Sequence, residues 1–219
     1  MTHPFFTDFE QRKKHVRHYL AVVAKTEREA QLGSTTAVQG RLLVLRAGTF
    51  LVLYNLVEAS MRGAVEAIHD KITTNAVHFS SLNISLRKQV VALFKKKADA
   101  SINHTLEDFP AAFVAIALTN AVNLSGSVDA KAIRELGARY GFSCDCTQER
   151  TRGGSDLVTI KGNRNDLAHG LKTFEEVGRD FTAANLLTLS RRSMRYMGEI
   201  LTHIADYIDN DGYLEKAAM

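Results

Sequence analysis

The chain has 219 residues, of which 45% are apolar and 24% are charged, and its formal net charge is +4. That apolar content excludes a mainly disordered chain, two cysteines exclude a disulfide scaffold, and the length predicts a single domain over residues 1–219. The longest uncharged run has a purely apolar part of only 111–118, well short of the roughly 20 residues that a bilayer requires. With no apolar signal core at the N-terminus, we expect a cytoplasmic protein without membrane contact.

The spacing of apolar residues is helical along almost the whole chain, which predicts an all-α fold. The expected helices span 5–31, 41–72, 85–101, 111–122, 130–139 and 156–169, followed by a long last helix that begins after Thr182. Asp129 and Gly141 are expected to begin and end the fifth helix, and Gly170 to end the sixth. Together these elements predict an up-and-down bundle built around a long helix pair.

Some segments leave alternatives open. Residues 142–155 are expected to form an exposed loop that is most flexible at 152–155. Residues 157–160 (Leu-Val-Thr-Ile) fit an extended segment as well as a helix. The first helix, within 1–35, either completes the bundle or forms an arm for dimerisation, and residues 212–219 are expected to be a flexible tail.

The basic residues are clustered in two stretches. The first lies between Glu10 and Glu27, the second lies between Asp70 and Asp99, and neither stretch contains an acidic residue. Clustered cations raise the local concentration of polyanions, nucleic acid above all, although solvated helix faces would have the same composition. The residues that we expect to contact RNA are Arg12, Lys13, Lys14, Arg17, Lys95, Lys96 and Lys97.

Common cofactor and metal sites are missing from the sequence. There is no glycine-rich phosphate loop followed by Lys-Ser or Lys-Thr, and no GxGxxG after a strand. Cys144 and Cys146 form a lone CxC without a second pair of ligands, so we expect two free thiols rather than a zinc site. We therefore expect neither a metal nor another cofactor.

One polar segment, residues 161–170, combines the groups that phosphate chemistry needs. On a helix, Asn165 and His169 share a face, and the long side chain of Arg164 can reach the same opening. His169 would lie in the last turn, where the helix dipole favours an imidazolium that can donate a proton. Arg164 offers a planar fork for a phosphate, and Asn165 adds donors and an acceptor. The alternative is a surface arginine beside a histidine that ends a packed helix.

The segment Arg164-Asn165-x-x-Ala168-His169-Gly170 resembles the Arg-x(4–6)-His signature of the HEPN superfamily (higher eukaryotes and prokaryotes nucleotide-binding domains). From about residue 40 onward, further segments resemble a branch of small stand-alone HEPN proteins that is associated with toxin-like and anti-phage defence loci in prokaryotes. These segments are Tyr54–Arg62, Asp129–Leu136, Tyr140–Phe142 and Phe174–Glu176.

The resemblance implies a bundle of four or five main helices that forms a homodimer and brings two Arg/His motifs together. It also implies metal-independent endoribonuclease activity, with Arg164, Asn165 and His169 as the site, and a role as a toxin or defence effector. RNA would be the substrate, and an antitoxin or a defence-system protein would be a further partner. The alternative is a non-catalytic HEPN module that binds nucleotide or RNA, or serves as a scaffold for a partner.

Glu58 and Arg62 are two further candidates, separated by four residues on the second helix. From the residues alone, they form an intrahelical ion pair that stabilises the helix by about 0.3–0.5 kcal/mol. The family suggests a supporting role instead, in which Glu58 reaches the motif and holds Arg164 or His169 in place.

Overall fold

The computed structural model describes residues 3–33, 35–98, 109–119, 121–122, 124 and 128–215, without the side chains of 97–98 and 109–112. Its described part is helical, with no strand beyond a single bridge between Leu82 and Leu214, so the predicted all-α fold is confirmed. The α-helices are α1 (Pro4–Gln31), α2 (Thr36–Thr74), α3 (Ile84–Ala98), α4 (Phe109–Leu118), α5 (Ala130–Tyr140), α6 (Gln148–Thr151), α7 (Asp156–Ala168), α8 (Phe174–Arg179) and α9 (Ala183–Asp209).

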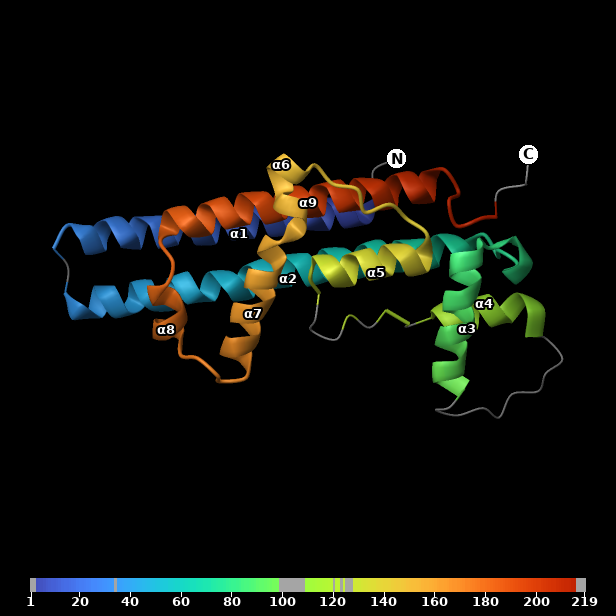
Figure 1. The fold of residues 1–219 in the computed structure, drawn as a ribbon, viewed down its shortest axis with the longest axis horizontal. Helices are drawn as coiled ribbons and strands as arrows, with labels where there is room; N and C mark the ends of the chain where they lie inside the picture. Colours follow the sequence, from blue (N-terminus) through green and yellow to red (C-terminus); the bar gives the residue numbers. More distant parts are fainter. Residues whose placement is uncertain are drawn as a thin grey trace.

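Three long helices, α1, α2 and α9, run side by side along the length of the molecule (Figure 1). With 39 residues, α2 is about 58 Å long at 1.5 Å per residue, and it contacts α1, α4, α7, α8 and α9. Its apolar side chains form the centre of the core, where Phe50, Leu53 and Ile68 are fully buried. Burial of such side chains, at about 25 cal/mol per Å², is the main force that holds the bundle together.

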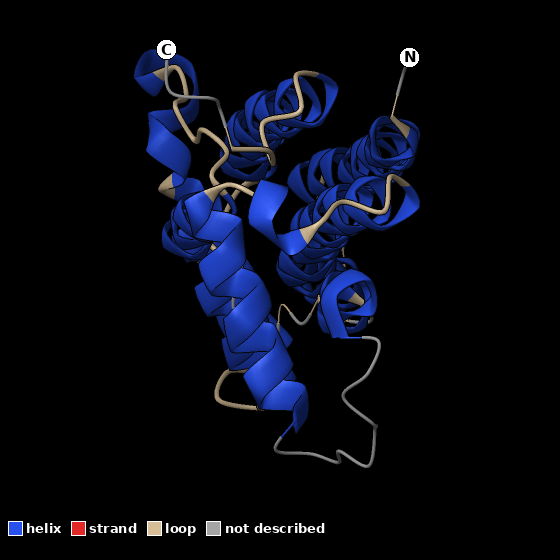
Figure 2. Ribbon diagram, turned by 90° about the vertical axis from the view of Figure 1, so that its right-hand side faces the viewer, coloured by secondary structure: helices blue, strands red, loops and turns tan. Residues whose placement is uncertain are grey.

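The first helix belongs to this bundle. Phe9, Val16 and Val23 of α1 are buried in the common core, and α1 contacts both α2 and α9. In Figure 2 the long helices are seen nearly end-on, with the N-terminus at one side of the bundle. In the structure, α1 is therefore packed as part of the bundle.

By length and composition, α2 is the one described helix that could cross a membrane. Half of its most apolar stretch is buried inside the bundle, and polar Thr49 and Ser60 are buried there with the apolar residues. A core helix of a globular domain has the same composition, and the contacts of α2 with five other helices fit that explanation.

Local capping signals set several helix ends as predicted. The Asp129 carboxylate accepts a hydrogen bond from the Ala132 amide (2.9 Å) at the start of α5, and Gly141 ends that helix with φ +95°. Thr182 begins α9 in a capping box with Asn185. Residues 157–160 are helical, so the extended alternative is wrong.

The exposed loop predicted for 142–155 needs correction. It contains α6 and a 3₁₀ turn at Arg152–Gly154, and Gly154 is buried. With φ +77°, Gly154 lies so close to the ring of Tyr196 that an added Cβ would come within 2.8 Å of it. The glycines expected to give flexibility instead allow a tight turn to pack against α9.

Two further segments differ from the simple pattern. The short helix α8 was not predicted, and Gly178 lets it lie directly on α2, because a Cβ there would overlap the Leu43 carbonyl. At the C-terminus, Tyr213 is buried and the amide of Glu215 donates to the Ser81 carbonyl (2.8 Å). These residues fall in the segment 212–219 expected to be a tail, of which 216–219 lie outside the described residues.

The α5 cap provides a test of stability against pH. Burial of Asp129 disfavours its charged form, but Lys161 and the Ala132 amide outweigh burial and hold the pKa of the carboxyl below its usual value. Because folding lowers this pKa, the ionised carboxylate stabilises the fold at pH values above the pKa of about 3.9 that an unfolded aspartate has. Because asparagine also caps helices well, Asp129→Asn is expected to lower the free energy of unfolding by about 0.5–1 kcal/mol at neutral pH, after solvent screening. In urea denaturation, the difference from wild type should shrink as pH falls through the lowered pKa, and a difference that is constant with pH would contradict this.

Candidate active site between α2 and α7

Arg164 projects from α7 onto the surface of α2. Its guanidinium lies over the ring of Tyr54, 4.5 Å from the centroid, and its Nη1 donates to the Asn165 Oδ1 (3.0 Å). Tyr54 is itself buried, and its hydroxyl accepts a hydrogen bond from the Val128 amide (3.1 Å). A cation on a fixed aromatic ring keeps its charge but loses much of its freedom, so Arg164 is held ready for an anion.

The exposed face of α2 below Arg164 forms a hollow of about 410 Å³. Six side chains of α2 line it together with Arg164, and these are Leu51, Tyr54, Asn55, Glu58, Ala59 and Arg62. Their spacing of three or four residues places them on one side of the helix. Two arginines and one glutamate give the hollow a positive balance, as an anion-binding site requires.

The supporting candidates Glu58 and Arg62 are both part of this hollow. Arg62 forms an ion pair with Glu58 (3.3 Å) and donates to the Val122 carbonyl (3.3 Å). The intrahelical pair therefore exists, and it lies in the same hollow as Arg164. Glu58 also acts on Tyr54, whose pKa is raised above its ordinary value, first by burial and further by the nearby carboxylate.

The basic candidate Arg12 approaches this site from α1. Its guanidinium donates to Asn55 (2.7 Å) and to Asp8 (2.7 Å). Arg12 and His15 line a second hollow of about 280 Å³ that shares Leu51 and Asn55 with the first. Leu51 and Asn55 were not predicted as site residues from the sequence. The available signal was an exposed side chain, apolar in Leu51 and polar in Asn55, on the outer face of a core helix.

The other basic candidates lie elsewhere, so the two basic stretches do not form one patch. Lys13 pairs with Glu10 (2.5 Å) and, with Arg17, faces α9. Lys14 lines a separate hollow on α1. Lys95 and Lys96 are exposed near the end of α3, and the side chain of Lys97 lies outside the described residues.

His169 occupies the C-cap of α7. Its amide donates to the Asn165 carbonyl (2.9 Å), its ring is exposed, and Gly170 follows with φ +67°. His169 does not line the hollow that contains Arg164. Leu171 is 72% exposed and Phe174 is 37% exposed immediately after it, so this end of α7 presents apolar surface around the histidine.

In the part of the chain that the structure describes, no group of three or more His, Cys, Asp or Glu side chains could hold a metal ion. Cys144 and Cys146 are free thiols. Burial raises the pKa of Cys144 to about 11 and that of Cys146 to about 12, so neither is a reactive thiolate at neutral pH.

Comparison with known proteins identifies a family. The family model described as HEPN_MAE_28990-like HEPN matches residues 1–213, which includes α1 and so extends beyond the part that the sequence resemblance covered. No curated protein and no solved structure matches the chain.

Proposed function

The chain belongs to the HEPN superfamily, and from this premise we propose that it is a metal-independent endoribonuclease. The observation that carries the proposal is the placement of Arg164, which stands over Tyr54 in a positively charged hollow. The same helix, α7, ends on an exposed histidine, His169. Asn165, bonded to Arg164 (3.0 Å), completes the proposed site.

These groups suit cleavage of RNA by its own 2′-hydroxyl. A base removes the 2′-OH proton while the 2′ oxygen forms a bond to the adjacent phosphorus. The bond from phosphorus to the 5′ oxygen breaks, and an acid protonates that leaving oxygen. The products are a 2′,3′-cyclic phosphate and a 5′-hydroxyl. Arg164 stabilises the charge that grows on the phosphate oxygens, and His169 carries one of the two protons.

The reaction needs two proton carriers, and each chain supplies one histidine of this motif. We propose a two-fold homodimer in which Arg164 of one chain acts with His169 of the partner subunit, which carries one proton, while water carries the other. Leu171 and Phe174, exposed beside His169, give such an interface apolar area. The separation of His169 from the hollow around Arg164 within one chain also favours a site assembled from two copies.

The biological role proposed here is that of a cytoplasmic toxin or anti-phage defence effector. An unrestrained ribonuclease harms its own cell, so the proposal includes a neutralising antitoxin or a defence-system partner. Glu58 and Arg62 take a supporting role as the charged wall against which Arg164 is placed. A non-catalytic HEPN module that grips RNA or a protein partner is the competing outcome.

The test is incubation of purified protein with total RNA in EDTA, followed by analysis of the new ends. New 2′,3′-cyclic phosphate and 5′-hydroxyl ends, produced by wild type and not by His169→Ala purified in parallel, would support the proposal. Cleavage by both proteins would assign the activity to another residue or to a contaminant. RNA that is bound and left uncut by wild type would favour the binding module.

A further inference from the structure

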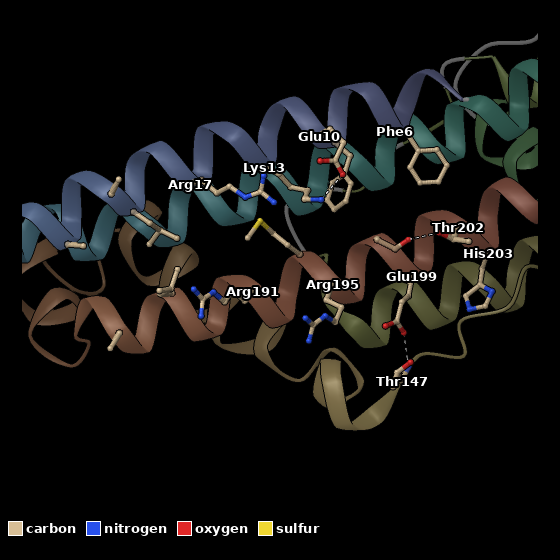
Figure 3. Close-up of a pocket in the computed structure, with 18 of the residues that line it drawn as sticks. Phe6, Glu10, Lys13, Arg17, Thr147, Arg191, Arg195, Glu199, Thr202 and His203 are labelled. Carbon is tan, nitrogen blue, oxygen red and sulfur yellow. Dashed lines mark hydrogen bonds and ion pairs between the residues drawn. The ribbon is translucent and has the colours of Figure 1, made fainter. Parts of the chain in front are cut away.

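A long groove runs between the outer faces of α1 and α9 (Figure 3). Its volume is about 1270 Å³, above the roughly 300–1,000 Å³ of most small-molecule sites. It shares no lining residue with the hollow around Arg164. An open, elongated groove of this size suits a chain-like ligand better than a compact one.

Both walls of the groove carry arginines that form no ion pair within the described residues. Arg17 projects from α1, and Arg191 and Arg195 project from α9 across from it (Figure 3). All three are exposed, and within the described residues none of them forms an ion pair or a side-chain hydrogen bond. Arg191 and Arg195 are separated by one helical turn, about 6 Å, so they offer two successive charges along the groove.

Three acidic residues line the groove, Glu10, Asp145 and Glu199, and each has a partner. The Asp145 carboxylate accepts a hydrogen bond from the Ser143 hydroxyl (2.9 Å). Glu10 pairs with Lys13 (2.5 Å), and Glu199 accepts a hydrogen bond from the Thr147 amide (2.7 Å). In Figure 3, Glu10 and Glu199 lie farther along the helices than Arg17 and Arg191. Arg17 and Arg191 therefore lie at the end of the groove away from these two carboxylates, and Arg195 lies between Arg191 and Glu199 along α9 (Figure 3).

The groove also presents apolar side chains, of which Phe6 lies at the end beyond Glu10 (Figure 3). Phe6 on α1 is partly exposed, and Leu187 on α9 is 37% exposed. Leu20 and Met194 line the groove as well, with only 6% and 8% of their surface exposed. Cationic walls with aromatic or apolar surface between them are characteristic of sites that hold single-stranded nucleic acid, where phosphates meet the cations and bases meet the apolar surface.

We propose that this groove binds a single strand of the RNA substrate, with backbone phosphates on Arg17, Arg191 and Arg195. The proposal rests on the proposed function for the identity of the ligand. It extends that function by separating strand binding, between α1 and α9, from the chemistry at Arg164 and His169. A second copy of the chain is the competing occupant.

The test measures binding without chemistry. A fluorescent 2′-O-methyl RNA of about 15 nucleotides, a length in the range that single-strand sites cover, lacks the 2′-hydroxyl nucleophile, so wild-type protein cannot cut it by the proposed route. Fluorescence anisotropy gives its affinity at salt concentrations from about 50 to 200 mM. Combining Arg17→Gln, Arg191→Gln and Arg195→Gln is expected to weaken binding at least about tenfold at low salt. It should also reduce the salt slope by about 2, since each phosphate contact to a single strand contributes about 0.7.

A matched control removes the same charge outside the groove. Combined Lys25→Gln, Lys131→Gln and Arg139→Gln changes three exposed cations that do not line the groove, and it should leave the salt slope near the wild-type value. Equal loss in both triple variants, or no loss in the arginine variant, would overturn the proposal. So would a change of oligomeric state in the arginine variant, measured by light scattering, because the groove would then hold a second copy.

The outcomes for the groove and for the ribonuclease are independent. Binding that depends on the three arginines, in a protein that never cuts RNA, would leave the groove in place and remove the proposed catalysis. If the arginine variant binds the RNA and cuts total RNA as well as wild type does, the groove proposal fails and the proposed catalysis stands.

Discussion

An equimolar mixture of Arg164→Ala and His169→Ala chains is expected to recover about a quarter of wild-type ribonuclease activity, if subunits exchange freely in a two-fold dimer. Each variant alone should be slower by about 10²–10⁴-fold, the usual effect of losing an acid–base group or a charge-stabilising donor. In a mixed dimer, one composite site loses both groups and the other keeps both. Half of the dimers are mixed and half of their sites are intact, which gives the expected fraction.

The measurement is the initial rate of RNA cleavage in EDTA after the two variants are co-purified or mixed under conditions that allow exchange. Each variant mixed with itself is the control for preparation. Recovery near the expected fraction requires Arg164 of one chain to act with His169 of the partner subunit. Mixed dimers, verified by differential tags, that remain as inactive as the single variants would contradict a site composed in this way.

Asp156→Ala is expected to destabilise the fold by about 2–4 kcal/mol, because it removes one partner of a buried ion pair. Asp156 is buried at the start of α7, where both of its oxygens accept hydrogen bonds from Arg192 of α9 (2.6 and 3.1 Å). Arg152 lies 3.7 Å away on its exposed side. The pair fixes α7, which carries Arg164 and His169, to the long helix α9.

Urea denaturation followed by circular dichroism measures the effect. Glu149→Ala removes an exposed carboxylate from the first turn of α6 and should change stability by less than about 0.5 kcal/mol. Adding Arg192→Leu to Asp156→Ala should restore part of the loss, since the unpaired guanidinium is then removed. A double variant as unstable as the sum of the single ones would show that the pair itself contributes little.

Local signals in the sequence were sufficient for most helices and several of their ends. The Asp129 cap, the Gly141 stop and the start of α9 after Thr182 each depend on bonds within a few residues, so they can be predicted without knowledge of the fold. The helical spacing of apolar residues likewise predicted α1, α2 and α9, because their buried stripes repeat at the period of the helix.

The candidate site could likewise be predicted from the sequence only in part. The motif of Arg164, Asn165 and His169 on one helix was visible in the sequence, as was the Glu58–Arg62 pair, because these residues are neighbours in the chain. The stacking of Arg164 on Tyr54 and the arrival of Arg12 at Asn55 were not visible. They depend on how far each helix is rotated and where it crosses its neighbour, which the packing of the whole core determines.

The sequence by itself determined that this chain is helical, where most helices begin and end, and which family motif it carries. Only the tertiary structure decided which charges meet. It separated Arg12 from Arg17, although both lie in one basic stretch, because residues five apart on a helix point to different sides. It brought Arg17 opposite Arg191 and Arg195 across the groove between α1 and α9. Periodicity is a property of each helix alone, whereas a binding surface is made by the contact between helices.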